Sequence, residues 1–183
     1  PTPGFKLSTY ANDGSEIDES TETIVLQAVT AVSGSPAQID VTATPTSINF
    51  ESTLTIRIQN QNPLATGANV QITIPDDFTV PSAVTVTTQG SNLDPAPTSS
   101  LLGRVLTVES VNTAYMSPFQ FMYINIAGVT NPAQTQPTAT FIVTLLDSNN
   151  QAIETVDNGV FFTATSGGFS SLLLAVDDPY INT

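Results

Sequence analysis

The sequence of 183 residues predicts an all-β protein whose main domain is a sandwich of two sheets. Apolar and polar residues alternate with a period of two in many short segments, as in strands that bury one face. Turn pairs such as Asn62-Pro63 and Asn131-Pro132 separate these segments and leave no room for long helices. The third observation is an internal repeat: the sequence pattern of the first part of the chain recurs, with substitutions, near its end.

The alternation assigns the strands in chain order. The first three have apolar residues at Ile39, Val41 and Ala43, then at Leu54, Ile56 and Ile58, and then at Val70, Ile72 and Ile74. Further strands are expected at residues 84–88, 104–108, 119–126, 138–146 and 151–165, the last with a turn signal at residues 157–159. Short strands with frequent turns favour a Greek-key β-sandwich of immunoglobulin-like architecture.

The repeat has an offset of 136 residues, which is Pro137 minus Pro1. Asp18 and Glu154 are acidic partners at this offset, and Asp13-Gly14 lies over Asn149-Asn150. Both pairs suit a two-residue hairpin turn, so residues 5–18 and 141–154 are predicted to form hairpins of the same shape. The identical pairs are Pro1 and Pro137, Thr2 and Thr138, Phe5 and Phe141, Ile17 and Ile153, and Ala28 and Ala164.

A second similarity, at an offset of 133 (Leu172 minus Ile39), predicts the module boundaries. Residues 1–36 are interpreted as the C-terminal hairpin of a preceding module, residues 37–168 as one complete module, and residues 169–183 as the first strand of a following one. A repeat of this length is a whole domain, and a domain of this size buries enough surface to fold without disulfides.

The composition excludes several classes of function. There is no cysteine or histidine, so thiolate nucleophiles, Ser-His triads and ordinary zinc sites are excluded. A net charge of −13 repels phosphate backbones and anionic lipids, so nucleic acid and membrane surfaces are not expected as partners. No segment reaches the roughly 18 apolar residues of a membrane span, so membrane insertion is not expected either. The acidic, cysteine-free composition with low charge density is typical of extracellular and cell-surface proteins.

Two strands depart from the simple alternation. In residues 119–126, Phe119, Phe121 and Tyr123 alternate with further apolar residues, and both faces of residues 141–146 are also apolar. One interpretation is a central strand covered by a loop, and the other is an apolar patch buried against a neighbouring module or chain. The interface candidates are Phe119, Phe121, Tyr123, Leu172, Leu174 and Val176.

Residues 60–64 followed by residues 70–76 resemble a segment of repeated β-sandwich modules in very large protist surface and extracellular proteins. A second motif of those modules is similar to residues 5–18 and again to residues 141–154. The Asn-Pro and Ile-Pro-Asp pattern also resembles bacterial surface-stalk repeats. The resemblance implies a spacer or fibre-forming role and transfers no catalytic residue.

Carboxylates are the only candidate catalytic groups that remain. A glycosidase needs two carboxylates that face each other across a cleft, but the acids of this chain lie at turns and the chain has no tryptophan. No enzyme is therefore expected. Calcium at a module junction is the alternative to solvated surface acids, although the repeat replaces several of the acids. The weak calcium candidates are Asp13, Glu16, Asp18, Asp76 and Asp77. No other cofactor is expected.

Residues 94–100 have the proline, serine and threonine composition of O-glycosylated segments, with Thr98, Ser99 and Ser100 as candidate sites. The alternative is a plain polar loop.

The function expected from the sequence is that of a structural module in an extracellular or cell-surface fibre or stalk. Its partners are other copies of the same protein, joined head to tail by β-strand contacts in a linear filament. The alternative is an adhesin-type domain that binds a glycan or protein ligand.

Overall fold

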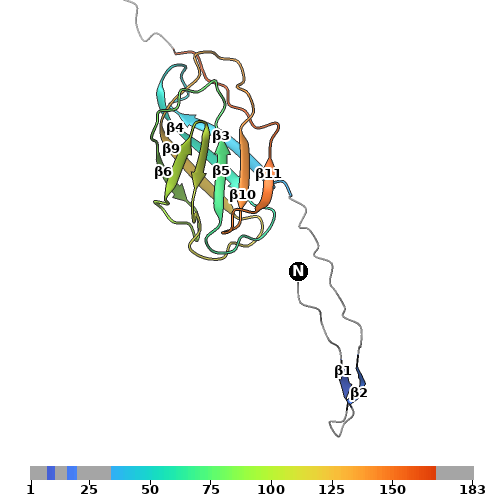
Figure 1. Cartoon of the computed structure of the whole chain (residues 1–183). Coiled ribbons are helices and arrows are strands. Elements are labelled where there is room, and N and C mark those ends of the chain that lie inside the picture. The colour runs from blue at the N-terminus through green and yellow to red at the C-terminus, as the bar shows by residue number, and fades with distance from the viewer. Residues whose placement is uncertain (1–7, 11–15, 20–33, 168–183) are drawn as a thin grey trace, which may run out of the picture. The chain divides into compact units, whose positions relative to one another are not determined.

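The computed structural model describes residues 8–10, 16–19 and 34–167, which belong to two units divided near residue 33. The first unit contains a hairpin of β1 (Ser8–Tyr10) and β2 (Glu16–Glu19). The second is an all-β sandwich (Figure 1). Its strands are β3 (Gln38–Thr44), β4 (Glu51–Gln59), β5 (Asn69–Thr73), β6 (Thr85–Gln89), β7 (Ser99–Leu102), β8 (Val105–Val108), β9 (Phe121–Thr130), β10 (Ile142–Leu146) and β11 (Ala152–Val156).

The sandwich consists of two antiparallel sheets. The four-stranded sheet has the order β3-β4-β9-β6, and the five-stranded sheet has the order β11-β10-β5-β8-β7. Neighbours in each sheet pair antiparallel throughout. Two sheets with apolar inner faces fold because each covers the other from water.

The predicted alternation explains the core. In the four-stranded sheet, Ile56 lies opposite Val41 on one side and Ile124 on the other, so one row of side chains faces inward. In the five-stranded sheet, Ile72 lies between Val143 and Leu106 in the same way. All of these except Val41 on the edge strand are fully buried. Burying each such side chain stabilises the fold by roughly 1.5–3 kcal/mol.

Several predicted strand bounds were wrong. Residues 119 and 120 precede β9, because Phe119 has a φ of 62° and cannot continue an extended strand. Residues 138–141 precede β10, and β11 ends at Val156, where the turn signal at residues 157–159 breaks the predicted strand. Strand β7 is a further difference, because residues 99 and 100 form a strand where their composition predicts a polar loop or an O-glycosylated segment.

Three buried asparagines hold the loops of the sandwich. The side chain of Asn60 accepts from the Gln120 amide and donates to two carbonyls, and Asn112 and Asn131 also make three bonds each. All three side chains are at most 2% exposed. An asparagine offers both donors and an acceptor, so it can satisfy loop backbone groups that are removed from water.

The two hairpins of the chain have the same register. Ser8 pairs with Glu19, Thr9 with Asp18, and Tyr10 with Glu16. Adding 136 to each number gives the pairs of β10 and β11, which are Thr144 with Thr155, Leu145 with Glu154, and Leu146 with Ala152. The register shift between Thr9 and Tyr10 falls at the same place as the one between Leu145 and Leu146. The prediction of equivalent hairpins is therefore confirmed for the described strands.

The turn of the second hairpin differs from the prediction. The Asn150 amide donates to the Asp147 carbonyl and the Asp147 amide to the Gln151 carbonyl, which encloses a loop of residues 148–150. Only Asn150 of the Asn149-Asn150 pair has a positive φ, of 61°. The loop therefore has three residues, the last of them in the left-handed conformation, and the prediction of a two-residue turn is wrong for this hairpin. The Asp13-Gly14 turn lies outside the described residues.

Candidate functional site

The outer face of the four-stranded sheet is the candidate interaction surface, because it carries two of the predicted aromatics. Asp40, Arg57, Tyr123 and Gln89 lie opposite one another on successive strands and form one row across the sheet. Phe121 lies on the same face as Tyr123, two residues earlier on β9. The residues of β9 that alternate with them, such as Ile124, are buried in the core.

Arg57 organises this face. Its guanidinium forms an ion pair with Asp40 at 2.6 Å and lies 4.1 Å from the centre of the Phe121 ring. The planar cation therefore has an acid at one end and an aromatic ring against its face, an arrangement that holds it in place. Phe119 is 59% exposed, and its carbonyl accepts a hydrogen bond from Gln59.

A cleft of about 480 Å³ adjoins this row at the β3 edge of the sandwich. Asp40, Thr42, Arg57 and Tyr123 line it on the sheet side, and Phe161 lines it from the segment after β11. Phe161 is 54% exposed. The cleft combines an aromatic ring with charged and hydroxyl groups, which is the chemistry of a site for a polar ligand with one apolar face.

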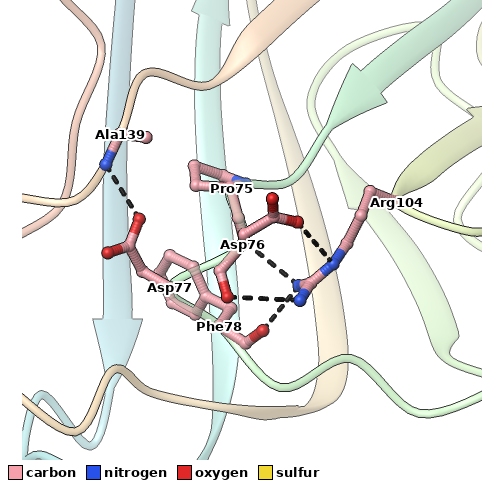
Figure 2. A network of polar contacts seen from close by, with 6 residues as sticks. All are labelled: Pro75, Asp76, Asp77, Phe78, Arg104 and Ala139. Atoms are coloured by element: carbon pink, nitrogen blue, oxygen red, sulfur yellow. Dashed lines mark hydrogen bonds and ion pairs between the residues drawn. The ribbon is translucent and has the colours of Figure 1, made fainter.

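The predicted calcium candidates Asp76 and Asp77 have protein partners (Figure 2). Asp76 forms an ion pair with Arg104 at 3.2 Å, and the Arg104 guanidinium also donates to the carbonyls of Pro75, Asp76 and Phe78. Asp77 accepts from the Ala139 amide at 2.9 Å. These acids therefore order two loops around the end of β5.

Of the other calcium candidates, Glu16 and Asp18 lie on β2, and Asp13 is outside the described residues. Within residues 34–167, no group of three acidic side chains is placed to hold a metal ion.

A buried carboxylate that was not among the candidates lies on β11. Glu154 is fully buried although β11 is the edge strand of its sheet. It lies opposite Leu145, so its side chain shares the core-facing side of the sheet. Its Oε1 accepts hydrogen bonds from the backbone amides of Gln61, at 2.9 Å, and of Asn62. Its Oε2 is buried without a hydrogen-bond partner among the described residues.

Glu154 joins distant parts of the module. It connects the edge strand of one sheet to the turn that follows β4 in the other. The signal in the sequence is the acid at the matching position Asp18, because an acid kept at both positions of the repeat indicates a shared structural role.

The glycosylation candidates lie at the opposite edge of the five-stranded sheet. Ser99 and Ser100 belong to β7, and Thr98 directly precedes it, with its carbonyl accepting from the Glu109 amide. Thr98 and Ser100 are exposed and Ser99 is half-buried. The interface candidates Leu172, Leu174 and Val176 lie outside the described residues.

Comparisons with models of protein families and with curated proteins return no match for this chain. In the part of the chain that the structure describes, no helix is long and apolar enough to cross a membrane.

Proposed function

We propose that this chain is a segment of a tandem-repeat protein of the cell surface or extracellular space, in which β-sandwich modules follow one another as a stalk or fibre. The observation that carries the proposal is the shared register of the two hairpins, including the register shift. A register is set by turn geometry and side-chain pattern, so two hairpins that agree at every described pair favour a common module plan.

The strand order supports an immunoglobulin-like module. When β3, β4, β9 and β6 are taken as strands A, B, E and D, the four-stranded sheet has the A-B-E-D order. Strands β5, β10 and β11 then correspond to C, F and G, and they are adjacent in the other sheet. On this assignment the β7–β8 hairpin is an insertion between D and E. Residues 1–33 and 169–183 are then the flanking parts of neighbouring modules, and residues 34–36 belong to this module because Gly34 pairs with β11.

The surface chemistry supports a structural role outside the cell. The net charge of −13 keeps neighbouring copies soluble and disfavours nucleic acid as a partner. The described acids Asp76, Asp77 and Glu154 have protein partners that account for their positions. We infer a mechanical role without catalysis, with other copies of the protein as partners through β-strand contacts between chain ends.

The proposal is tested with three copies of residues 34–169, one period of 136 residues, joined in tandem. Small-angle scattering should show a maximum dimension that grows by a constant increment from one to three copies. Each copy should unfold with the same midpoint in urea. A compact particle, in which the dimension grows with the cube root of mass, would contradict a stalk.

The second candidate is an adhesin-type domain, and the cleft beside β3 favours it. Exposed Phe161 and the ion-paired Arg57 could bind the apolar face and the hydroxyls of a glycan, or a protein loop. A glycan array probed with the chain tests this candidate. Binding that is lost in both Phe161→Ala and Arg57→Ala would favour adhesion over a purely structural role.

A further inference from the structure

The first described segment of the sandwich runs parallel to its last strand. Gly34 donates its amide hydrogen to the Ile153 carbonyl at 3.1 Å and accepts from the Thr155 amide at 2.8 Å. The bridge between Gly34 and Glu154 is parallel, and the Ser35 hydroxyl donates to the Thr155 carbonyl at 3.3 Å. The chain thus pairs with β11 before it crosses to the other sheet as β3.

The last described segment makes a second parallel contact. The Thr165 amide donates to the Thr46 carbonyl at 2.9 Å, and the Ile48 amide donates to the Thr165 carbonyl at 3.0 Å. The bridge between Ser47 and Thr165 is parallel. The hydroxyl oxygens of Thr46 and Thr165 are also within hydrogen-bond distance, at 2.9 Å.

The parallel direction decides how these contacts respond to tension. When the two ends of the module are pulled apart, residue 34 is drawn toward its N-terminal side and β11 toward its C-terminal side. In a parallel pair these directions are opposite along one axis, so the segments must slide past each other. All hydrogen bonds of the contact are then stretched together. An antiparallel pair pulled in this way would open from one end, one bond at a time.

Each contact is anchored to the core by a buried polar side chain. Glu154, in the first contact, accepts from the Gln61 and Asn62 amides, so sliding of β11 must also break these bonds. In the second contact, Asn131 donates to the carbonyls of Pro45 at 2.7 Å and Ser47 at 2.8 Å. Glu154 and Asn131 are 0% and 2% exposed.

We propose that the two parallel contacts, Gly34 with β11 and Thr165 with residues 46–48, form a mechanical clamp that resists extension of the module along the fibre. This inference rests on the proposed function, because only a stalk or fibre is loaded through its two ends. It goes further by assigning the resistance to two sites that contain few of the module's hydrogen bonds.

The first experiment changes the direction of pulling in the full chain by atomic-force spectroscopy. Because the chain has no cysteine, a single added thiol gives a unique attachment point. Pulling between the two chain ends loads both contacts in shear. The second geometry pulls between the N-terminus and a cysteine at Asn149→Cys, in the exposed loop before β11. Both β11 and Gly34 are then pulled from their N-terminal sides, so the bonds of the first contact open one after another.

The unfolding peak of residues 34–167 is identified by its gain in length, roughly 450 Å for 134 residues pulled from the ends. We expect end-to-end pulling to need about twice the force of pulling through residue 149, because unfolding under force follows the barrier along the pulled direction. Equal forces in the two directions would overturn the proposal. This comparison requires no change in either contact.

The second experiment uses a matched pair of proline variants. Thr165→Pro removes an amide bond of 2.9 Å and a hydroxyl contact from the clamp. Thr113→Pro removes an amide bond of 2.8 Å and a hydroxyl bond to Asn92, in a loop outside the clamp. Both residues are exposed. Proline lacks the amide hydrogen, so each variant loses comparable bonds.

We expect Thr165→Pro to lower the end-to-end unfolding force by about half and Thr113→Pro to leave that force nearly unchanged. Both variants should lower the urea midpoint by a similar amount, so a difference in force does not reflect a difference in overall stability. A fall in force that is equal in the two variants would overturn the clamp. If Thr165→Pro does not fold, the comparison of pulling directions still decides the matter. A failed clamp with a linearly growing tandem protein would leave the stalk intact, whereas a compact tandem protein would refute the stalk itself.

Discussion

Glu154 and the Asp76-Asp77 pair show how differently one fold uses the same chemical group. Glu154 is fully buried, and its carboxylate accepts backbone amides from the turn after β4. Asp76 has a side chain that is 95% exposed and meets Arg104 at the surface. Asp77 is half-buried, and it accepts from the Ala139 amide.

The difference lies in what replaces water around the charge. At Asp76 water still solvates the carboxylate, so the ion pair adds little to stability. At Glu154 only protein groups are available, so each hydrogen bond replaces water and each missing one has a cost. We therefore expect removal of Glu154 to destabilise the module most, and removal of Asp76 least.

The largest expected effect is that of Glu154→Ala. The Gln61 and Asn62 amides lose their acceptor and a cavity remains, so the free energy of unfolding should fall by about 3 kcal/mol or more. Urea denaturation measures this change. Glu154→Gln keeps one oxygen as an acceptor and should lose less. A loss below about 1 kcal/mol in the alanine variant would show that water reaches these amides.

Arg104→Ala should have the next effect. Its guanidinium donates to the carbonyls of Pro75, Asp76 and Phe78, so we expect a loss of about 1–2 kcal/mol in the free energy of unfolding. Arg57→Ala is the matched control, because its side chain is similarly exposed and also forms an ion pair, but its guanidinium lies against the Phe121 ring whereas that of Arg104 donates to carbonyls. An equal loss in both variants would mean that the carbonyls of the turn add no more than an ion pair with a ring contact.

The two aspartates of this turn should differ in how much they stabilise the module, which a comparison of Asp77→Ala with Asp76→Ala tests. Asp77 caps the Ala139 amide, and its loss should cost about 1 kcal/mol. Loss of Asp76 should cost less than about 0.5 kcal/mol, because a screened surface ion pair is weak. Urea midpoints of the two variants decide the order. The reverse order would show that the ion pair, and not the cap, orders the turn.

The smallest effect concerns pH at the Asp147 loop. The pKa of Asp147 is lowered from 3.8, chiefly because the Gln151 amide donates to its carboxylate, and also because the Asn149 amide does so. A lowered pKa in the folded state gives stability that is present above pH 3.8 and is lost as the pH falls through the folded pKa.

Asp147→Asn keeps the oxygen that accepts these amides and removes the titration. We expect its free energy of unfolding to depend less steeply on pH below 3.8 than that of the unchanged chain. Urea titrations across this range measure the slope. Identical slopes would assign the acid sensitivity to other carboxylates.

The sequence by itself predicted the two-sheet architecture and most of the strands. Its period-two pattern places Leu54, Ile56 and Ile58 on one face of a strand, and only a second apolar face can cover them. The equivalence of the two hairpins was also readable, because their strand pattern recurs at an offset of 136, although the turn of the second hairpin was not. The missed strand β7 lacks such a pattern, and pairing with β8 alone decides its conformation.

Only the tertiary structure decided which polar residues carry the fold. Glu154 lies within a strand and Asp77 in a turn, but nothing local shows that the carboxylate of either accepts from backbone amides far away in sequence. Burial against residues 61 and 62, far away in sequence, makes Glu154 a buried acceptor, and the same kind of distant contact buries Asn112. The strength of a polar group depends on the water removed around it, which is a property of packing between distant segments and not of neighbouring residues.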